Sequence, residues 1–292
     1  MILKEVRKNK INSYFIISVF IITIMLIVYF VCIAFDLGPI SAIIALLFAS
    51  ISAIASYYSC DKIVLGINNA RPATESQDKL LSTVLDNLCI ASGLTRPKLY
   101  VIEDSSPNAF ATGRNPETSV ICVTTGLLEE MNKYELEGVL AHELSHIKNY
   151  DILLSTVVSV FVGFVVILAD VIFRASFFRR DSDDNGNSGI ILQLIGIVFL
   201  LLSPLFATLM QLAISRKREF LADSSSVEIT RNPEGLISAL EKLSKNDKPL
   251  EAANKATAHM YITNPFKNEK KRNLFSTHPP IEERIKHLQN IN

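Results

Sequence analysis

The chain has 292 residues, 49% of them hydrophobic, and its 29 basic and 29 acidic side chains cancel to a formal net charge of zero. Without a basic excess there is no electrostatic footprint for nucleic acid, so no nucleic-acid partner is expected. The four cysteines have no CxxC spacing, which indicates reduced thiols and not a disulfide framework.

Two apolar runs lie near the start of the chain, Tyr14–Phe35 and Ile40–Tyr58. Each is long enough to cross about 30 Å of hydrocarbon. Only residues 36–39 separate them, so residues 1–59 are predicted to form a tight antiparallel transmembrane hairpin. A cleavable signal peptide fits poorly, because the first run is too long and a second span follows directly.

Residues 60–152 are predicted to form the first half of a catalytic domain. Gln77–Ser92 has the pattern of an amphipathic helix, and Lys98–Ile102 and Ser119–Thr124 have that of strands. A reverse turn at residues 114–117 joins Ala109–Gly113 to the second strand. We expect a small sheet with one edge open to an extended peptide substrate; an ordinary core hairpin is the alternative.

The most informative segment is Ala141–Tyr150, because it contains a His-Glu-x-x-His element. Asn132 and Glu135 have the spacing of a helix-opening capping box, and apolar residues follow at helical period. His142 and His146 therefore lie one turn apart on one helix face, where both can reach one metal ion, and Glu143 points toward a water at that ion. The alternative is an amphipathic core helix with two surface histidines.

Gly138 lies one turn before His142, where the absence of a side chain would let another segment approach the metal face of the helix closely.

A catalytic zinc site needs a third protein ligand. Glu219 is a candidate, and Asp223, one helical turn on, could accept the other ring N–H of a ligating histidine. Both carboxylates could instead belong to a solvated helix start. Other candidates for the third ligand are Glu228, Glu234, His259 and His278.

A second pair of apolar runs, Leu153–Phe173 and Ile190–Ile214, is predicted to form a second transmembrane hairpin at residues 153–215. Residues 216–292 then form the second half of the catalytic domain, with helices at Pro233–Leu243 and Ile281–Leu288. If His142 and Glu219 share one metal, both later runs must cross the membrane or neither does.

Charge sets the expected orientation. Four basic residues precede the first run, and its hairpin turn has none, which places the N-terminus and the active site on the cytoplasmic side. They are Lys4, Arg7, Lys8 and Lys10. Arginines in the connector at residues 174–189 weaken this argument for the second pair.

His278 is followed by two prolines and is held on a stiff segment, where it could donate to the oxyanion of a tetrahedral intermediate or simply lie at the surface. Arg284 could support that region by pairing with an acidic residue that the sequence leaves unassigned.

Four stretches together resemble the HtpX-type membrane zinc endopeptidases, relatives of the CAAX prenyl proteases. They are residues 108–113 (NAFATG), 142–151 (HELSHIKNYD), 218–223 (REFLAD) and 276–280 (STHPP). The fold class expected is a mainly α-helical multi-pass membrane protein with a zincin-like α+β metalloprotease domain that carries a small β-sheet.

The resemblance implies a role for each matching residue. His142, His146 and Glu219 would hold one Zn²⁺ per chain, Glu143 would be the general base, and His278 would act in catalysis. Asp223, Asn149 and Asp151 would support the ligands, and Asn108, Ala109 and Phe110 would contact the substrate. The substrates would be misfolded or membrane proteins, cleaved for quality control at the cytoplasmic membrane.

Two other functions fit part of the pattern. A zinc-binding membrane scaffold or chaperone would keep the ligands but would have no use for Glu143. A prenyl-protein processing protease would need an enclosed chamber in the membrane, which four spans are too few to build. The sequence predicts polypeptide substrates and a lipid bilayer as partners and leaves the oligomeric state open.

Overall fold

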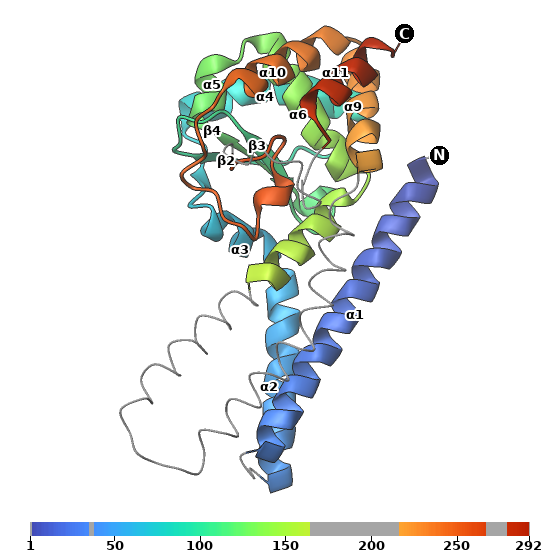
Figure 1. The fold of residues 1–292 in the computed structure, drawn as a ribbon, viewed down its shortest axis with the longest axis vertical. Coiled ribbons are helices and arrows are strands. Elements are labelled where there is room, and N and C mark those ends of the chain that lie inside the picture. Colours follow the sequence, from blue (N-terminus) through green and yellow to red (C-terminus); the bar gives the residue numbers. More distant parts are fainter. Residues whose placement is uncertain (1, 35–37, 164–215, 267–278, 292) are drawn as a thin grey trace.

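The computed structural model describes residues 2–34, 38–163, 216–266 and 279–291. Two long helices extend from a unit in which helices surround a four-stranded sheet (Figure 1). The elements before the metal-site helix are α1 Ile2–Ala34, α2 Gly38–Tyr58, α3 Cys60–Ile67, β1 Arg71–Pro72, α4 Glu75–Ser92, β2 Lys98–Ile102, β3 Ala109–Thr112, η1 Pro116–Thr118, β4 Val120–Thr124 and α5 Thr125–Glu130. The later elements are α6 Lys133–Lys148, a helix at Asp151–Gly163, α9 Arg216–Thr230, α10 Pro233–Lys245, η2 Ala258–Met260 and α11 Ile281–Gln289.

Helices α1 and α2 run side by side away from the sheet-containing unit (Figure 1). Both present large apolar side chains outward, among them Phe15 and Ile22 on α1 and Ile40 and Leu47 on α2. Helix α1 begins at Ile2, well before the predicted apolar run, because its charged N-terminal residues continue the same helix. Within the described residues, one segment, Val6–Leu26, is long and apolar enough to cross a membrane by length and composition.

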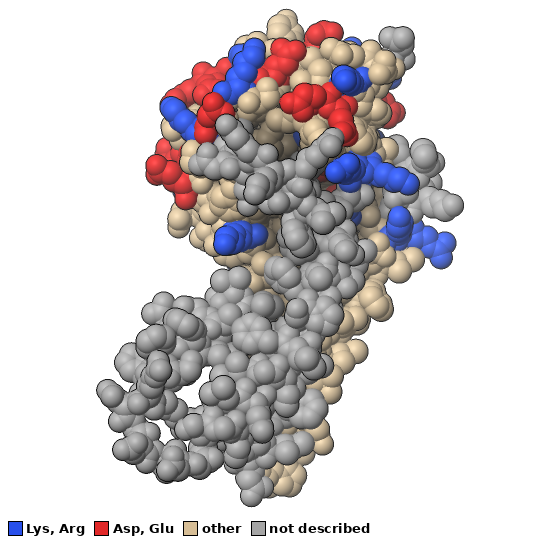
Figure 2. Space-filling view, viewed as in Figure 1, with Lys and Arg blue, Asp and Glu red and all other residues tan. Residues whose placement is uncertain are grey.

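Charged side chains gather on the other end of the molecule, over the unit that holds the sheet (Figure 2). The visible described surface of the long helices carries almost none (Figure 2). This division places an apolar surface where a bilayer would surround it.

Only part of the second predicted membrane pair falls in the described structure. The helix Asp151–Gly163 follows α6 directly, and Tyr150 between them has a left-handed backbone with φ 59°. Its apolar residues, including Leu154, Val158 and Phe161, are buried and pack against Ile16 of α1. The remainder of the run to Phe173 and the whole run Ile190–Ile214 lie outside the described residues.

The sheet has the strand order β1-β2-β4-β3. Strands β2 and β4 are parallel, with Lys98 opposite Val120, whereas β3 pairs with β4 antiparallel, with Ala109 opposite Val123. The predicted turn between β3 and β4 is confirmed, and Asn115 closes it by accepting a hydrogen bond from the Thr118 N–H at 2.9 Å. The strand β1 was missed, because two residues are too few to show a periodic pattern.

Both faces of the sheet are buried, and every residue of β4 is buried. One face packs in a core with α4, α6, α10 and Leu288 of α11, so residues from both predicted halves of the catalytic domain share one hydrophobic core. The other face packs against α3 and the segment that contains Tyr261. The helices predicted around the sheet are confirmed, with boundaries that differ by no more than about two residues.

Candidate metal centre and active site

Helix α6 begins with the predicted capping box. The Asn132 side chain accepts hydrogen bonds from the main-chain N–H groups of Tyr134 and Glu135, and Glu135 accepts one from the Asn132 N–H. Glu135 also bonds Ser238 at 2.6 Å and Lys242 at 2.7 Å, both on α10. Burial opposes ionisation of Glu135, but the Lys242 and Ser238 hydrogen bonds outweigh it and lower its pKa. The start of α6 is therefore fixed to α10.

Gly138 and Gly235 let α6 and α10 approach each other closely. A Cβ atom at Gly138 would lie 2.6 Å from the Leu236 nitrogen, and one at Gly235 would lie 2.5 Å from the Tyr134 carbonyl oxygen. The sequence-based expectation of a close approach at Gly138 is confirmed, and the approaching segment is the start of α10.

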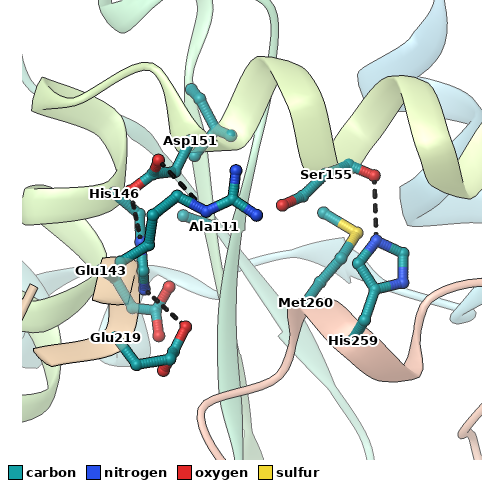
Figure 3. Close-up of a pocket in the computed structure, with 10 residues that line it drawn as sticks. Ala111, Glu143, His146, Asp151, Ser155, Glu219, His259 and Met260 are labelled. Carbon is teal, nitrogen blue, oxygen red and sulfur yellow. Dashed lines mark hydrogen bonds and ion pairs between the residues drawn. The ribbon is translucent and has the colours of Figure 1, made fainter. Parts of the chain in front are cut away.

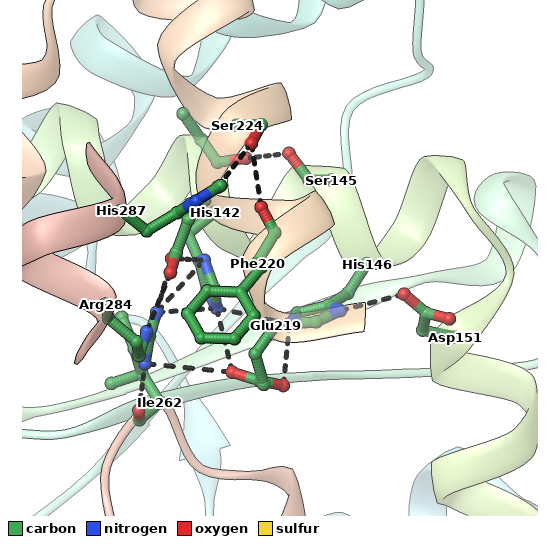
Figure 4. Close-up of polar contacts among 12 residues, drawn as sticks. His142, Ser145, His146, Asp151, Glu219, Phe220, Ser224, Ile262, Arg284 and His287 are labelled. Carbon is green, nitrogen blue, oxygen red and sulfur yellow. Dashed lines mark hydrogen bonds and ion pairs between the residues drawn. The ribbon is translucent and has the colours of Figure 1, made fainter. Parts of the chain in front are cut away.

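Three side chains converge on one point between α6 and α9 (Figure 4). Ligand atoms of His142, His146 and Glu219 all lie within 4.8 Å of one another. The two Nε2 atoms are 3.2 Å apart, and the Glu219 carboxylate oxygens lie 3.7 Å from His142 Nε2 and 3.6 Å from His146 Nε2. In the parts of the chain that the structure describes, this is the group of side chains arranged to hold a metal.

A carboxylate lies behind each imidazole. Asp223 is 3.0 Å from His142 Nδ1. Asp151, seen beside His146 in Figure 4, is 3.0 Å from His146 Nδ1. An imidazole that donates its Nδ1–H presents a lone pair at Nε2. Two such lone pairs face each other beside the Glu219 carboxylate, an arrangement that is unfavourable unless a cation or proton lies among them. The residues therefore fit a divalent metal with nitrogen and oxygen ligands, as zinc prefers.

Arg284 of α11 is the buried cation of this network (Figure 4). It donates to both Asp223 oxygens, at 2.9 and 2.6 Å, and to the Ile262 carbonyl at 2.9 Å. Its Nη2 lies 3.3 Å from His142 Nδ1, and its Nη1 lies 3.7 Å from Glu219. Burial opposes ionisation of Asp223, but the charge of Arg284 and the hydrogen bond from His142 outweigh it and hold its pKa well below the usual range.

The pKa values of the two histidines are shifted in opposite directions because their surroundings differ. Burial and the positive charge of Arg284 lower the pKa of His142. Burial also works to lower the pKa of His146, but the hydrogen bond to Asp151 and the negative charge of Glu219 outweigh it and raise that pKa to about 9. A proton on His146 Nε2 and a metal ion would compete for one lone pair.

Glu143 is buried beside these ligands, with 1% of its surface exposed. Burial raises its pKa to about 7, although the positive charge of His146 lowers it in part. Its Oε1 atom has no hydrogen-bond partner among the described residues. A buried carboxylate that keeps one oxygen unsatisfied next to a metal-type cluster is suited to accept a proton from water.

Glu143, His146 and Glu219 open into a pocket (Figure 3). Its other lining residues are Ala111, Asp151, Ile152, Ser155, Arg218, His259 and Met260. His259 lies across the pocket from Glu219, and its Nε2 is 3.2 Å from the Ser155 carbonyl oxygen (Figure 3). His259 therefore lines the pocket without joining the cluster, and neither Glu228 nor Glu234 joins it.

The remaining site residues expected from the sequence lie in different surroundings, and one of them lies outside the described residues. The Asn149 carbonyl accepts a hydrogen bond from Asn9, whereas its side-chain amide has no partner among the described residues. Asn108, Ala109 and Phe110 are 0%, 1% and 1% exposed and are not among the residues that line the pocket, so their contact with substrate stays a prediction. Asn108 instead donates to the Thr263 carbonyl at 3.1 Å. His278 lies outside the described residues.

Three features of the site were not predicted from the sequence. The acid that pairs with Arg284 is Asp223, which only the fold could show. Ala111 lines the pocket, and the alternation of small residues in β3 was a signal for it. Asn9 reaches Asp151 from α1; its spacing of four from Ser13, ahead of an apolar run, was a weak signal of a buried polar stripe.

A metal-type cluster on a His-Glu-x-x-His helix, with a buried carboxylate at a pocket and an apolar helix long enough to span a bilayer, defines the class of membrane metalloproteases. Comparison with known proteins agrees. The model of peptidase family M48 matches residues 75–292. The chain belongs to peptidase family M48 and is a metalloprotease, and the predicted HtpX-type resemblance is confirmed.

Relatives match over nearly the whole chain. A protease HtpX homolog of Dictyoglomus turgidum is 45% identical, with 98% of this chain and 93% of that protein aligned. One of Lactobacillus helveticus is 41% identical, with all of both chains aligned. The crystal structure of S. mikatae Ste24p aligns with 83% of this chain and 57% of its own, at a TM-score of 0.49 and 20% identity.

Proposed function

We propose that the chain is a zinc-dependent membrane endopeptidase that hydrolyses peptide bonds of misfolded or membrane proteins. The observation that carries the proposal is the convergence of His142, His146 and Glu219 beside the buried Glu143. One zinc ion per chain would be held by those three ligands, which leaves a position for water. The scaffold alternative has no use for Glu143, and the relatives are named proteases.

When bound, zinc would supply Lewis-acid chemistry by acidifying a water molecule and polarising the scissile carbonyl. Glu143 would take the proton from that water and deliver it to the leaving amine. A pKa near 7 suits a group that must both accept and release a proton at neutral pH. Asp223 and Asp151 would keep each Nδ1–H engaged, so that both Nε2 atoms point at the centre.

The outer edge of β3, at its Ala111 end, would bind the substrate main chain. The Asn108 carbonyl accepts from Thr124 of β4, whereas the Ala109 carbonyl accepts from Ile262 on the opposite edge. By the alternation of a strand, the main-chain groups of Ala111 also point to that outer edge, next to Glu143. An extended peptide paired there would lie across the pocket without needing a particular sequence. His278 would donate to the oxyanion.

Residues 1–59 and 153–215 would form two transmembrane hairpins, and residues 60–152 and 216–292 the two halves of a catalytic domain on the cytoplasmic side of the cell membrane. The apolar surface of α1, the charge distribution in Figure 2 and the basic N-terminus support this arrangement.

Zinc content and casein hydrolysis of the purified chain test the proposal. Glu219→Ala should lose both, whereas Glu228→Ala, an exposed glutamate on the same helix, should keep both. Full zinc occupancy in Glu219→Ala would remove Glu219 from the ligand set, and a wild-type chain that binds no metal would overturn the proposal.

A further inference from the structure

Helix α1 makes a buried polar contact with the catalytic unit. Asn9 is 3% exposed, and its side-chain amide nitrogen donates two hydrogen bonds. One goes to the Asn149 carbonyl at 3.0 Å and the other to Asp151 Oδ1 at 2.6 Å. An amide NH₂ group has two hydrogens, and both are used here.

These two acceptors lie on either side of Tyr150, the left-handed residue between α6 and the next helix. The neighbouring residue of α1 contacts the same turn, because Lys10 Nζ lies 3.9 Å from the centre of the Tyr150 ring. Two successive residues of α1 therefore hold the turn at residues 149–151.

The contact continues to the metal cluster. While Asp151 Oδ1 accepts from Asn9, its Oδ2 lies 3.0 Å from His146 Nδ1. The Arg218 guanidinium also faces the Asp151 carboxylate, and its Nε lies 3.8 Å from Oδ1. The orientation of Asp151, and through it the direction in which His146 Nε2 points, thus depends on a donor that belongs to the candidate membrane span.

We propose that Asn9 is a positioning residue for the metal centre, through which the first membrane helix fixes Asp151 and His146. The inference rests on the proposed metal site. Partners that orient a metal-bound histidine from behind commonly change metal affinity 10–100-fold or so when removed. Metal binding in the catalytic unit is therefore coupled to the docking of α1, and a displaced α1 weakens the site although it contributes no ligand.

The test uses the full chain in detergent, with zinc affinity measured by competition with a chromophoric chelator. Asn9→Leu replaces the amide with an apolar side chain of similar size that has no donor, and it should weaken zinc binding about 10–100-fold. Ser13→Ala is the matched control, because Ser13 is fully buried one turn along and, within the described part of the chain, its hydroxyl bonds the Asn9 carbonyl of its own helix. It should change the affinity by less than about twofold.

A double-mutant cycle separates positioning from general packing. If Asn9 acts through Asp151, then Asn9→Leu should cost little further zinc affinity in an Asp151→Ala background. The visible absorption of the Co²⁺-loaded chain should change in Asn9→Leu and not in Ser13→Ala, because it reports ligand geometry. Thermal unfolding of the metal-free variants checks that both are folded.

Two failures can be told apart. A wild-type chain that binds neither zinc nor Co²⁺ defeats the proposed metal site itself. Wild-type affinity in a folded Asn9→Leu chain, or fully additive losses in the cycle, overturns the positioning role of Asn9 and leaves the metal site intact.

Discussion

Glu143 and the imidazoles beside it lie on one helix, but they have different tasks. Glu143→Gln should lower the rate of peptide hydrolysis about 10²–10⁴-fold, because the amide cannot accept the proton of water. Zinc content should stay at the wild-type level, because Glu143 is not in the metal-type cluster. Glu137→Gln on the same helix is the control and should keep near-normal activity. Normal turnover in Glu143→Gln would show that a group other than Glu143 accepts the proton of water.

The pKa of His146 makes metal binding depend on pH. In the metal-free chain the pKa of His146 is raised to about 9, so this imidazole carries a proton at pH 7 that a metal ion must displace. Affinity should therefore rise with pH up to about 9 and fall as pH decreases, by about tenfold per unit for one displaced proton.

Titration calorimetry in buffers of different ionisation enthalpy measures this proton directly. We expect release of about one proton per metal at pH 7. Asp151→Asn should release less, because it removes the carboxylate whose hydrogen bond and charge help to raise the pKa of His146. If the measured binding enthalpy of the wild-type chain did not change with the ionisation enthalpy of the buffer, no proton would be released, and the raised pKa of His146 would be contradicted.

At the scale of elements, the contact between α6 and α10 depends on two glycines. Gly138→Ala should destabilise the fold by about 1–3 kcal/mol, because the added Cβ would meet the Leu236 main chain at 2.6 Å and push the helices apart. Gly66→Ala on α3 is the control, since nothing lies within 4 Å of its Cβ position. That change should be neutral or stabilise by about 0.5–1 kcal/mol. Thermal unfolding measures both, and equal midpoints would contradict the close packing.

Most elements of the catalytic unit were predictable from local pattern. The capping box and apolar period predicted α6, and β-branched runs predicted β2 and β4, because short-range chemistry decides these structures. The reverse turn that leads into β4 was predicted correctly, whereas the burial of the Asn108 and Phe110 side chains was not predicted. They are buried because the segment at Thr263 and Tyr261 covers them, a contact between residues far apart in sequence.

The polar partners of the site were likewise predictable only where they lie close together in sequence. Asp223 was predicted to lie behind an imidazole from its spacing to Glu219 alone. The ion pair of Asp223 with Arg284 and the hydrogen bond from Asn9 to Asp151 were not predicted. Each joins segments far apart in sequence, and such contacts leave no periodic pattern.

At the scale of the whole molecule, the cluster requires α6 and α9 to be on one side of the membrane. Single cysteines at Ser188 and Ser276, in a chain lacking Cys32, Cys60, Cys89 and Cys122, test this with an impermeant thiol reagent on intact cells. Ser188 should react, because the connector at residues 174–189 is predicted to lie outside, and Ser276 should react only after lysis. Protection at both positions in intact cells would mean that the second pair does not cross.

The cluster also joins distant parts of one chain. His146 and Glu219 lie at either end of residues 147–218, and a shared ion would close that segment into a ring, as a disulfide does. Closing a loop of roughly seventy residues reduces the entropy of the unfolded chain enough to stabilise the fold by about 4 kcal/mol. The ion would thus serve as a removable cross-link. Chelation should loosen α9 from α6 before it loosens the sheet, and hydrogen exchange of the backbone amides can measure this order.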